Sequence, residues 1–237
     1  MVPISEVAEV NPSFPRTSKF APETLVSFLP MAAVSESGEI IVQEERPFGE
    51  VSKGYTYFAE GDVLMAKITP CMENGKATFV HNLKHSAGFG STEFHVLHPG
   101  SEVDGKYLFY MIWNPLFRKE AGRNMTGTAG QKRVPSSFLK DSQIPLPPLP
   151  EQKRIAAILD KADSIRRKRQ EAVRLTEELL RSVFMEMFGD PVTNPKGWKE
   201  TALTDVAEIV SGVTKGRKLD GKQTILAPYS ISITSVI

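Results

Sequence analysis

The stretch from Pro150 to Phe188 constrains the fold more than any other part of the chain, because no glycine lies in it and no proline follows its first residue. Both residue types interrupt helices, so their absence over this length predicts one continuous helix. Pro150 suits a first helical turn, and Gly189 with Pro191 is typical of a helix end. At a rise of about 1.5 Å per residue, the helix is expected to be roughly 58 Å long.

Apolar side chains recur every seven residues along this helix, in three neighbouring rows that together make one broad stripe. Arg169 and Thr176 interrupt one of the rows. Such a stripe is typical of a helix that packs on partner helices, since an isolated helix would leave it in water. We expect dimerisation or partner binding through these stripe residues: Ile155, Ile158, Leu159, Ala162, Ile165, Ala172, Val173, Leu179, Leu180, Val183 and Met187.

Residues 1–149 have a different sequence pattern, in which short apolar runs alternate with turns that contain glycine and proline. Asn74–Gly75 is a turn dipeptide between two of these runs and predicts a hairpin-like return. The expected strands are Gly61–Ile68, Lys76–Val80 and Glu93–Leu97, and the expected helices are Val103–Trp113 and Pro115–Arg123. We therefore expect an α+β fold class, in which a mixed α/β domain is followed by one long, coiled-coil-like helix. The proline-rich Gln143–Pro150 segment predicts a stiff connector between the two parts.

The chain also contains an internal repeat. Ile4–Val10 reads ISEVAEV, and Leu203–Ile209 reads LTDVAEI, at an offset of 199 residues. Both copies lie where a new domain would open, which indicates a tandem architecture. We expect a first domain over 1–149, a spacer or dimerisation helix over 150–188 and the incomplete start of a second domain over 189–237.

The composition is that of an ordinary globular protein, with 24% charged residues and a net charge of +1. No run of 18 apolar residues occurs, so no membrane span is expected. Cys71 is the single cysteine, which excludes a disulfide within one chain and fits a reducing cytoplasm. A nucleic-acid partner would require a local basic surface, because phosphate contacts dominate affinity. Arg166–Arg169 form one basic run, which fits either a solvated face or a contact with phosphate or a partner.

No assembled catalytic site is recognisable in the sequence. A phosphate-binding loop of the G-x-x-x-x-G-K-[ST] type is missing, so ATP hydrolysis is not supported. His81, His85, His95 and His98 lie within 18 residues and could be taken for a metal site, but no clean ligand motif accompanies them. We expect no catalytic residue, no metal and no cofactor; a metal-dependent nuclease that uses these histidines is the enzymatic alternative.

Three polar loops in residues 67–133 point instead to DNA. They combine Arg and Lys, hydroxyl groups, side-chain amides and flexible glycines, which are the groups that hold phosphate and read bases. We expect Gln131 to pair with adenine, and Lys132 and Arg133 to contact phosphate. The alternative interpretation is that each of these loops is an ordinary solvent-exposed loop without a ligand. The expected DNA-binding residues are Lys67, Thr69, Lys76, Ser91, Thr92, Arg123, Thr126, Thr128, Gln131, Lys132 and Arg133.

Several motifs resemble one protein family. The run PLPPLPEQKRIAAILDKAD, from Pro145 to Asp163, is similar to the central spacer of type I restriction–modification specificity subunits. FGDPVTNPKGW, from Phe188, followed by LTDVAEI resembles that family's entry into a second recognition domain. Gly61–Ile68, Gly90–Leu97 and Met125–Gln131 resemble strand and loop signatures of its target recognition domain. The resemblance extends from residue 1 to about residue 229 and leaves out the tail Ser230–Ile237.

The resemblance implies a non-catalytic subunit that binds double-stranded DNA and directs methyltransferase subunits to their target, with motor–nuclease subunits as a further partner. The family carries two recognition domains and two long helices, whereas this chain has one of each before Ile237. We expect a half-subunit whose two copies restore the family geometry as a homodimer. The competing hypothesis is a scaffold that docks methyltransferase without binding DNA.

Overall fold

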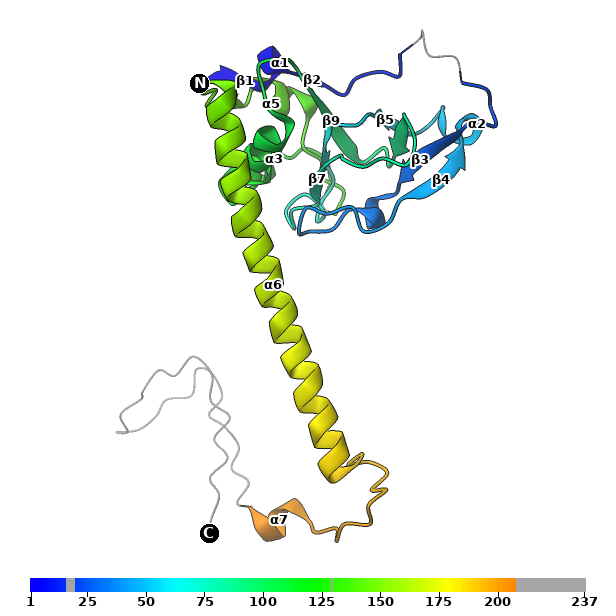
Figure 1. The fold of residues 1–237 in the computed structure, drawn as a ribbon, viewed down its shortest axis with the longest axis vertical. Coiled ribbons are helices and arrows are strands. Elements are labelled where there is room, and N and C mark those ends of the chain that lie inside the picture. The colour runs from blue at the N-terminus through cyan, green and yellow to red at the C-terminus, as the bar shows by residue number, and fades with distance from the viewer. Residues whose placement is uncertain (16–19, 129, 208–237) are drawn as a thin grey trace, which may run out of the picture. The chain divides into compact units, whose positions relative to one another are not determined.

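The computed structural model describes residues 1–15, 20–128 and 130–207 of the chain. It divides into two compact units, Met1–Lys168 and Arg169–Ile237, which are described separately. Figure 1 shows the first unit as strands and short helices beside the start of one long helix, α6 (Leu149–Phe188). This mixed arrangement confirms the expected fold class.

The first unit contains ten short strands and six shorter helical elements within its described residues. The strands are β1 (Val2–Pro3), β2 (Ala8–Val10), β3 (Leu25–Leu29), β4 (Glu44–Pro47), β5 (Thr56–Phe58), β6 (Val63–Ala66), β7 (Ala77–Phe79), β8 (Gly88–Gly90), β9 (Phe94–Pro99) and β10 (Gln143–Ile144). The helical elements before α6 are α1 (Ile4–Val7), the 3₁₀ helix η1 (Met31–Ala33), α2 (Phe48–Val51), α3 (Gly105–Trp113), α4 (Pro115–Arg123) and α5 (Ser136–Asp141). A short helix, α7 (Leu203–Val206), lies in the second unit.

Two four-stranded sheets form the body of the domain. The first has the order β2-β9-β6-β7 and is antiparallel throughout. The second has the order β4-β3-β8-β5, in which β3 and β8 run parallel. The short pair β1-β10 brings the start of the chain beside the segment that leads into α6. The largest core cluster lies where α3 packs on the first sheet and includes Tyr107, Leu108 and Ile112.

The hydrophobic pattern predicted the first sheet better than the second. Two of the expected strands contain β6 and β7, and the third overlaps β9, which continues two residues further to Pro99. The strands β6 and β7 pair as a hairpin, and the two expected helices correspond to α3 and α4. The strands of the second sheet were not predicted, and β8 shows why. Its sequence is Gly88–Phe89–Gly90, and a Cβ at Gly88 would lie 2.1 Å from the Phe58 ring. A strand can require glycine where another group approaches its backbone closely, and that approach is a tertiary property.

The helix α6 confirms the expected long helix, although it begins one residue earlier, at Leu149. It ends where Gly189 takes a φ of +78° and its N–H donates to the Met185 carbonyl at 2.9 Å, as in a glycine-terminated helix. Its first half belongs to the first unit, because Gln152, Ala156 and Asp163 are buried there. The compact unit therefore reaches Lys168 and includes the first half of α6 together with residues 1–149.

The internal repeat is reproduced in the backbone. The turns of α1 and α7 begin after residues with nearly the same dihedral angles, φ −66° and ψ 144° at Pro3 and φ −63° and ψ 139° at Ala202. In each, the residue after the helix donates its N–H to the first helical carbonyl. Residues 208–237, which hold most of the expected second domain, lie outside the described residues. No helix in the described ranges is long and apolar enough to cross a membrane.

Candidate nucleic-acid interface

Main-chain hydrogen bonds bring three separate segments of the chain together: the loop after β6, the turn before β9 and the hairpin of residues 126–133. The Lys67 N–H donates to the Glu93 carbonyl at 2.9 Å, and the Lys67 carbonyl accepts from the Val134 N–H at 2.9 Å. The Thr69 N–H donates to the Lys132 carbonyl at 3.0 Å. Residues predicted as separate polar loops are thus parts of one surface, which we call the three-loop surface.

The hairpin exposes the side chains that the sequence favoured for DNA. Thr126 and Arg133 exchange two main-chain hydrogen bonds, of 2.9 and 2.8 Å, which close the loop. Gly127 and Gly130 have φ values of +115° and +80°, which favour glycine. Four of the predicted residues are exposed between or beside these points, and they are Thr126, Thr128, Gln131 and Lys132. Their polar groups are therefore accessible to a ligand.

Arg133 has a different environment from the one expected. Its guanidinium binds both carboxylate oxygens of Glu93, with contacts of 2.8 to 3.2 Å, and also donates to the Gln131 carbonyl at 3.0 Å. The hydrogen bond from Arg133 lowers the pKa of Glu93, so this carboxylate stays ionised and offsets the arginine charge. The pairing with Glu93 favours a structural role for Arg133, in which it holds the hairpin in place. The phosphate contact expected from the sequence is less favoured by this geometry.

The sequence pattern did not indicate the structural role of His95, which bonds to the main chain at the end of this hairpin. The side chain is buried in β9, its Nε2–H donates to the Val134 carbonyl at 2.7 Å, and its Nδ1 lies 3.2 Å from the amide nitrogen of Asn11. This geometry fits a neutral imidazole with one donor and one acceptor. Burial lowers the pKa of His95, in agreement with the neutral form. The available sequence signal was its place inside an apolar run, since all four residues from Phe94 to Leu97 are buried and a polar side chain there requires hydrogen-bond partners.

The neutral His95 makes the stability of the domain depend on pH. Its pKa is lower in the folded state than the reference value of 6.5, so its contribution is present above that pH and is lost as the pH falls through the lower folded value. We expect His95→Gln to flatten the fall in unfolding free energy below about pH 6.5. Urea unfolding at several pH values measures this, with exposed His81→Gln as the matched control. An unchanged pH profile in His95→Gln would show that the histidine is not held neutral.

The remaining predicted DNA-binding residues divide into two groups. Thr69, Ser91 and Thr92 lie on or beside the three-loop surface; the Thr69 hydroxyl donates to Glu73 at 2.7 Å, and Thr92 is exposed. Lys76 instead donates to the Met31 carbonyl at 3.3 Å, and Arg123 pairs with Glu120 at 3.0 Å on the exposed end of α4. Within the described part of the chain, the side chains of Lys76 and Arg123 make their hydrogen bonds elsewhere and not to the three-loop surface.

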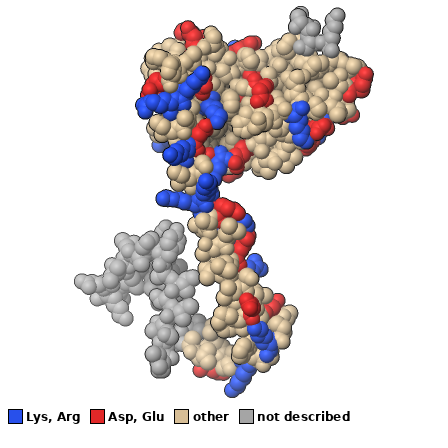
Figure 2. Space-filling view, in the orientation of Figure 1, with Lys and Arg blue, Asp and Glu red and all other residues tan. Residues whose placement is uncertain are grey.

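Charge is mixed over the first unit. Figure 2 shows basic and acidic side chains interspersed on one face, without a large uniform basic area. Six of the expected residues lie on the loop after β6 or on the hairpin, and they are Lys67, Thr69, Thr126, Thr128, Gln131 and Lys132. Affinity for nucleic acid would therefore depend on this local group and not on the net charge.

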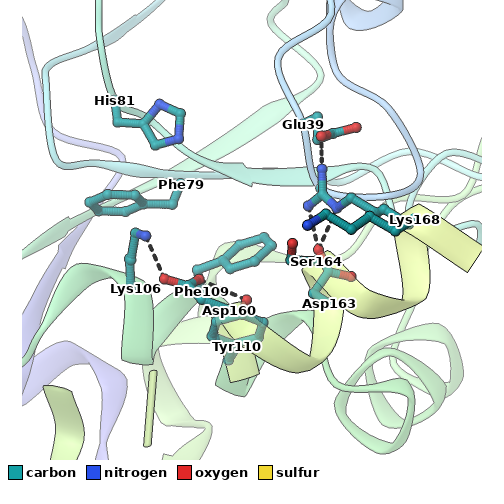
Figure 3. Close-up of a pocket in the computed structure, with 12 residues that line it drawn as sticks. Glu39, Phe79, His81, Lys106, Phe109, Tyr110, Asp160, Asp163, Ser164 and Lys168 are labelled. Carbon is teal, nitrogen blue, oxygen red and sulfur yellow. Dashed lines mark hydrogen bonds and ion pairs between the residues drawn. The ribbon is translucent and has the colours of Figure 1, made fainter. Parts of the chain in front are cut away.

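A cavity of about 350 Å³ lies between the domain and the first half of α6. Figure 3 shows Asp160 and Asp163 of α6 pointing into it beside Lys106 and Tyr110 of α3. Asp160 accepts from Lys106 at 2.6 Å and from the Tyr110 hydroxyl at 2.9 Å. Asp163 binds Arg166, and Arg167 links Asp163 to Glu39. Arg167 of the basic run thus holds α6 to its own domain, an outcome that the run alone did not indicate.

Most of the predicted apolar stripe is uncovered within the described structure. Ile155 packs on the core and Leu159 is half-buried, but Ile158 and Ile165 are 53% and 49% exposed. In the second unit, the stripe residues Ala172, Val173, Leu179, Leu180, Val183 and Met187 are all exposed. The helix therefore packs on its own domain with a largely polar face and leaves the apolar face free for another partner.

The four histidines do not converge on a common point. His85 pairs with Glu45 at 3.1 Å, His98 pairs with buried Asp62 at 2.6 Å, and His81 lies against the Phe79 ring. Among the described residues, no three His, Cys, Asp or Glu side chains are placed to hold a metal ion. The geometry gives no support to the nuclease alternative.

Comparisons with known proteins identify the family to which the sequence is similar. Residues 1–175 match the type I restriction modification DNA specificity domain. Two curated Escherichia coli proteins, the type I restriction enzyme EcoEI and EcoAI specificity subunits, are each 43% identical, over 162 and 154 residues. These matches cover 68% and 64% of this chain but only 27% and 26% of the relatives, so the chain matches about a quarter of their length.

Solved structures show the same fold. A chain from a type I R-M system, solved to explain its complex assembly and conformational transition, has a TM-score of 0.60 at 26% identity and matches 90% of this chain and 55% of its own length. The HsdS subunit from Thermoanaerobacter tengcongensis has a TM-score of 0.55 at 24% identity, over 87% of this chain and 54% of that one. With about three quarters of its sequence matched by the family model, the chain belongs to the type I restriction–modification DNA specificity family.

Proposed function

We propose that this chain binds a specific sequence in double-stranded DNA and directs DNA methyltransferase subunits to it. The observation that carries the proposal is the three-loop surface, where exposed Gln131 and Lys132 lie on a hairpin that Glu93 and His95 hold in place. A fixed hairpin with exposed amide and ammonium groups can read a base edge and hold phosphate together.

The long helix supplies the assembly part of the proposal. Two copies of the chain associate through the uncovered stripe of α6, which places two recognition domains in one homodimer. Methyltransferase subunits, and motor–nuclease subunits where a system has them, bind to this assembly, and the complex acts in the cytoplasm. The recognition chain has no catalytic role in this scheme.

Substitutions of Gln131 and Lys132, two of the exposed residues of the hairpin, should have different effects on binding. Gln131→Ala should relax the preference at one base pair by about 1–3 kcal/mol, because it removes a bidentate contact to adenine. Lys132→Ala should weaken binding to all sequences alike and reduce the slope of log affinity against log salt by about one unit, because it removes one phosphate contact. Binding is measured by fluorescence anisotropy on target and scrambled duplexes at several salt concentrations.

The target duplex for this experiment comes from selection of bound oligonucleotides in the presence of the methyltransferase subunit. Lys53→Ala is the matched control, since Lys53 is an exposed lysine in the turn after α2, away from the three loops in the chain. If both hairpin variants keep the affinity, slope and preference of the unmodified chain, the hairpin does not face DNA. If the unmodified chain itself shows no salt-dependent binding to DNA, the scaffold alternative replaces this proposal.

A further inference from the structure

Beside the cavity of Figure 3, the first unit has a second depression, whose lining is more apolar. It has a volume of about 340 Å³ and lies between α3 and the stripe side of α6. Tyr110, Met111 and Trp113 line it from α3, and Leu159 and Ala162 line it from α6. Asp163 and Arg166 of α6 also line it. Leu159 and Ala162 belong to the predicted stripe, so this groove is continuous with the uncovered apolar face of the helix.

The spacing of the stripe indicates what fills this groove. Counted from Arg169, Ile155 and Val183 are each 14 residues away. Ile158 and Leu180 are each 11 residues away, and Ile165 and Val173 are each 4 residues away. In an antiparallel pair of α6 helices centred on Arg169, residues at equal distances before and after the centre come level with one another. The stripe is therefore complementary to itself in the antiparallel direction.

The two-fold axis of such a pair also keeps each flank of the stripe against the same flank of the other copy. Leu159, Arg166, Val173 and Leu180 follow one another at seven-residue intervals and form one flank. The groove lies along the upstream part of that flank, at Leu159 and Arg166. The downstream part, Val173 and Leu180, is 59% and 65% exposed. These two apolar side chains match the apolar part of the groove, which Met111, Trp113 and Leu159 line.

We propose that the groove between α3 and α6 receives Val173 and Leu180 from the α6 helix of a second copy of this chain. This inference builds on the homodimer of the proposed function and adds a surface outside the helix itself. The dimer then joins α6 of one copy to the recognition domain of the other, so the groove contributes to fixing the position of the domain relative to the paired helices. Trp113, which lies 5.8 Å from the Arg166 guanidinium in a cation–π contact, forms the rim that the entering side chains meet.

Cross-linking between two differently marked chains tests this directly. Cys71 is the single cysteine, so both chains carry Cys71→Ser. A tagged full-length chain with Met111→Cys is mixed with an untagged chain with Leu180→Cys, refolded together and oxidised. A disulfide requires Cβ atoms within about 4.5 Å, so a tagged–untagged covalent dimer is expected only if position 180 enters the groove. Leu179→Cys, on the opposite flank of the stripe, is the matched control and is expected to give no such product.

The solution mass separates the failure of this inference from the failure of the homodimer. If light scattering shows a dimer but Met111→Cys and Leu180→Cys do not cross-link, or cross-link no better than the Leu179→Cys control, the helices pair without using the groove and the inference is wrong. If the chain is monomeric, the homodimer and the inference are both wrong. A third variant, Met111→Trp, is expected to weaken dimerisation by filling the groove. If it instead leaves the dimer intact and abolishes methyltransferase binding, the groove belongs to that subunit and the inference is overturned.

Discussion

Ile165→Asp is expected to convert a dimer of this chain into monomers and to abolish methyltransferase binding that depends on the dimer. Ile165 lies four residues from the centre of the proposed helix pair, and within the described structure its side chain is 49% exposed. In the pair, the substitution would place an unpaired carboxylate in an apolar seam, which costs on the order of several kcal/mol. A loss of this size raises the dissociation constant by roughly three orders of magnitude.

Light scattering and sedimentation of the purified chain measure this effect. Ala157→Asp is the matched control, because it introduces the same charge at an exposed position of α6 outside the stripe. The control should keep the mass and the methyltransferase binding of the unmodified chain. If Ile165→Asp also keeps both, the stripe is not the assembly interface.

Gln152→Leu is expected to reduce the unfolding free energy of the first unit by about 2–5 kcal/mol. Gln152 is fully buried, and its amide makes three hydrogen bonds to the main chain. It accepts from the Asp104 N–H at 2.8 Å and donates to the carbonyls of Glu102 and Pro147 at 2.9 and 2.8 Å. Leucine has a similar size but would leave these three buried polar groups without a side-chain partner.

Urea unfolding followed by the fluorescence of Trp113 measures this loss, in a background where Trp198→Phe removes the other tryptophan. The neighbouring Lys153→Leu is the control, because Lys153 is exposed and its replacement should change the free energy by less than about 0.5 kcal/mol. An equal unfolding midpoint in Gln152→Leu and the control would mean that Gln152 does not anchor α6 to the connector and α3. The two variants together separate the roles of the two faces of α6, since one face holds the domain and the other is proposed to hold a partner.

The sequence alone predicted the features that depend on neighbouring residues. The length of α6 follows from the absence of glycine and proline, and its end follows from Gly189. The hairpin of β6 and β7 follows from two apolar runs around a turn dipeptide. Family membership was also recognisable, because the spacer motif from Pro145 to Asp163 is a continuous stretch.

The tertiary structure decided which side chains act together, because the decisive contacts join residues far apart in the chain. Arg133 is predicted from the sequence as a phosphate contact, and only the tertiary structure showed its bidentate contact with Glu93, 40 residues away. Arg167 looked like part of a solvated or phosphate-binding run, but it reaches Glu39, and the polar face with Gln152 and Asp163 became the one that packs on the domain. Periodicity identified the apolar face of α6, but a burial pattern that uses polar side chains depends on the hydrogen-bond partners that other segments supply.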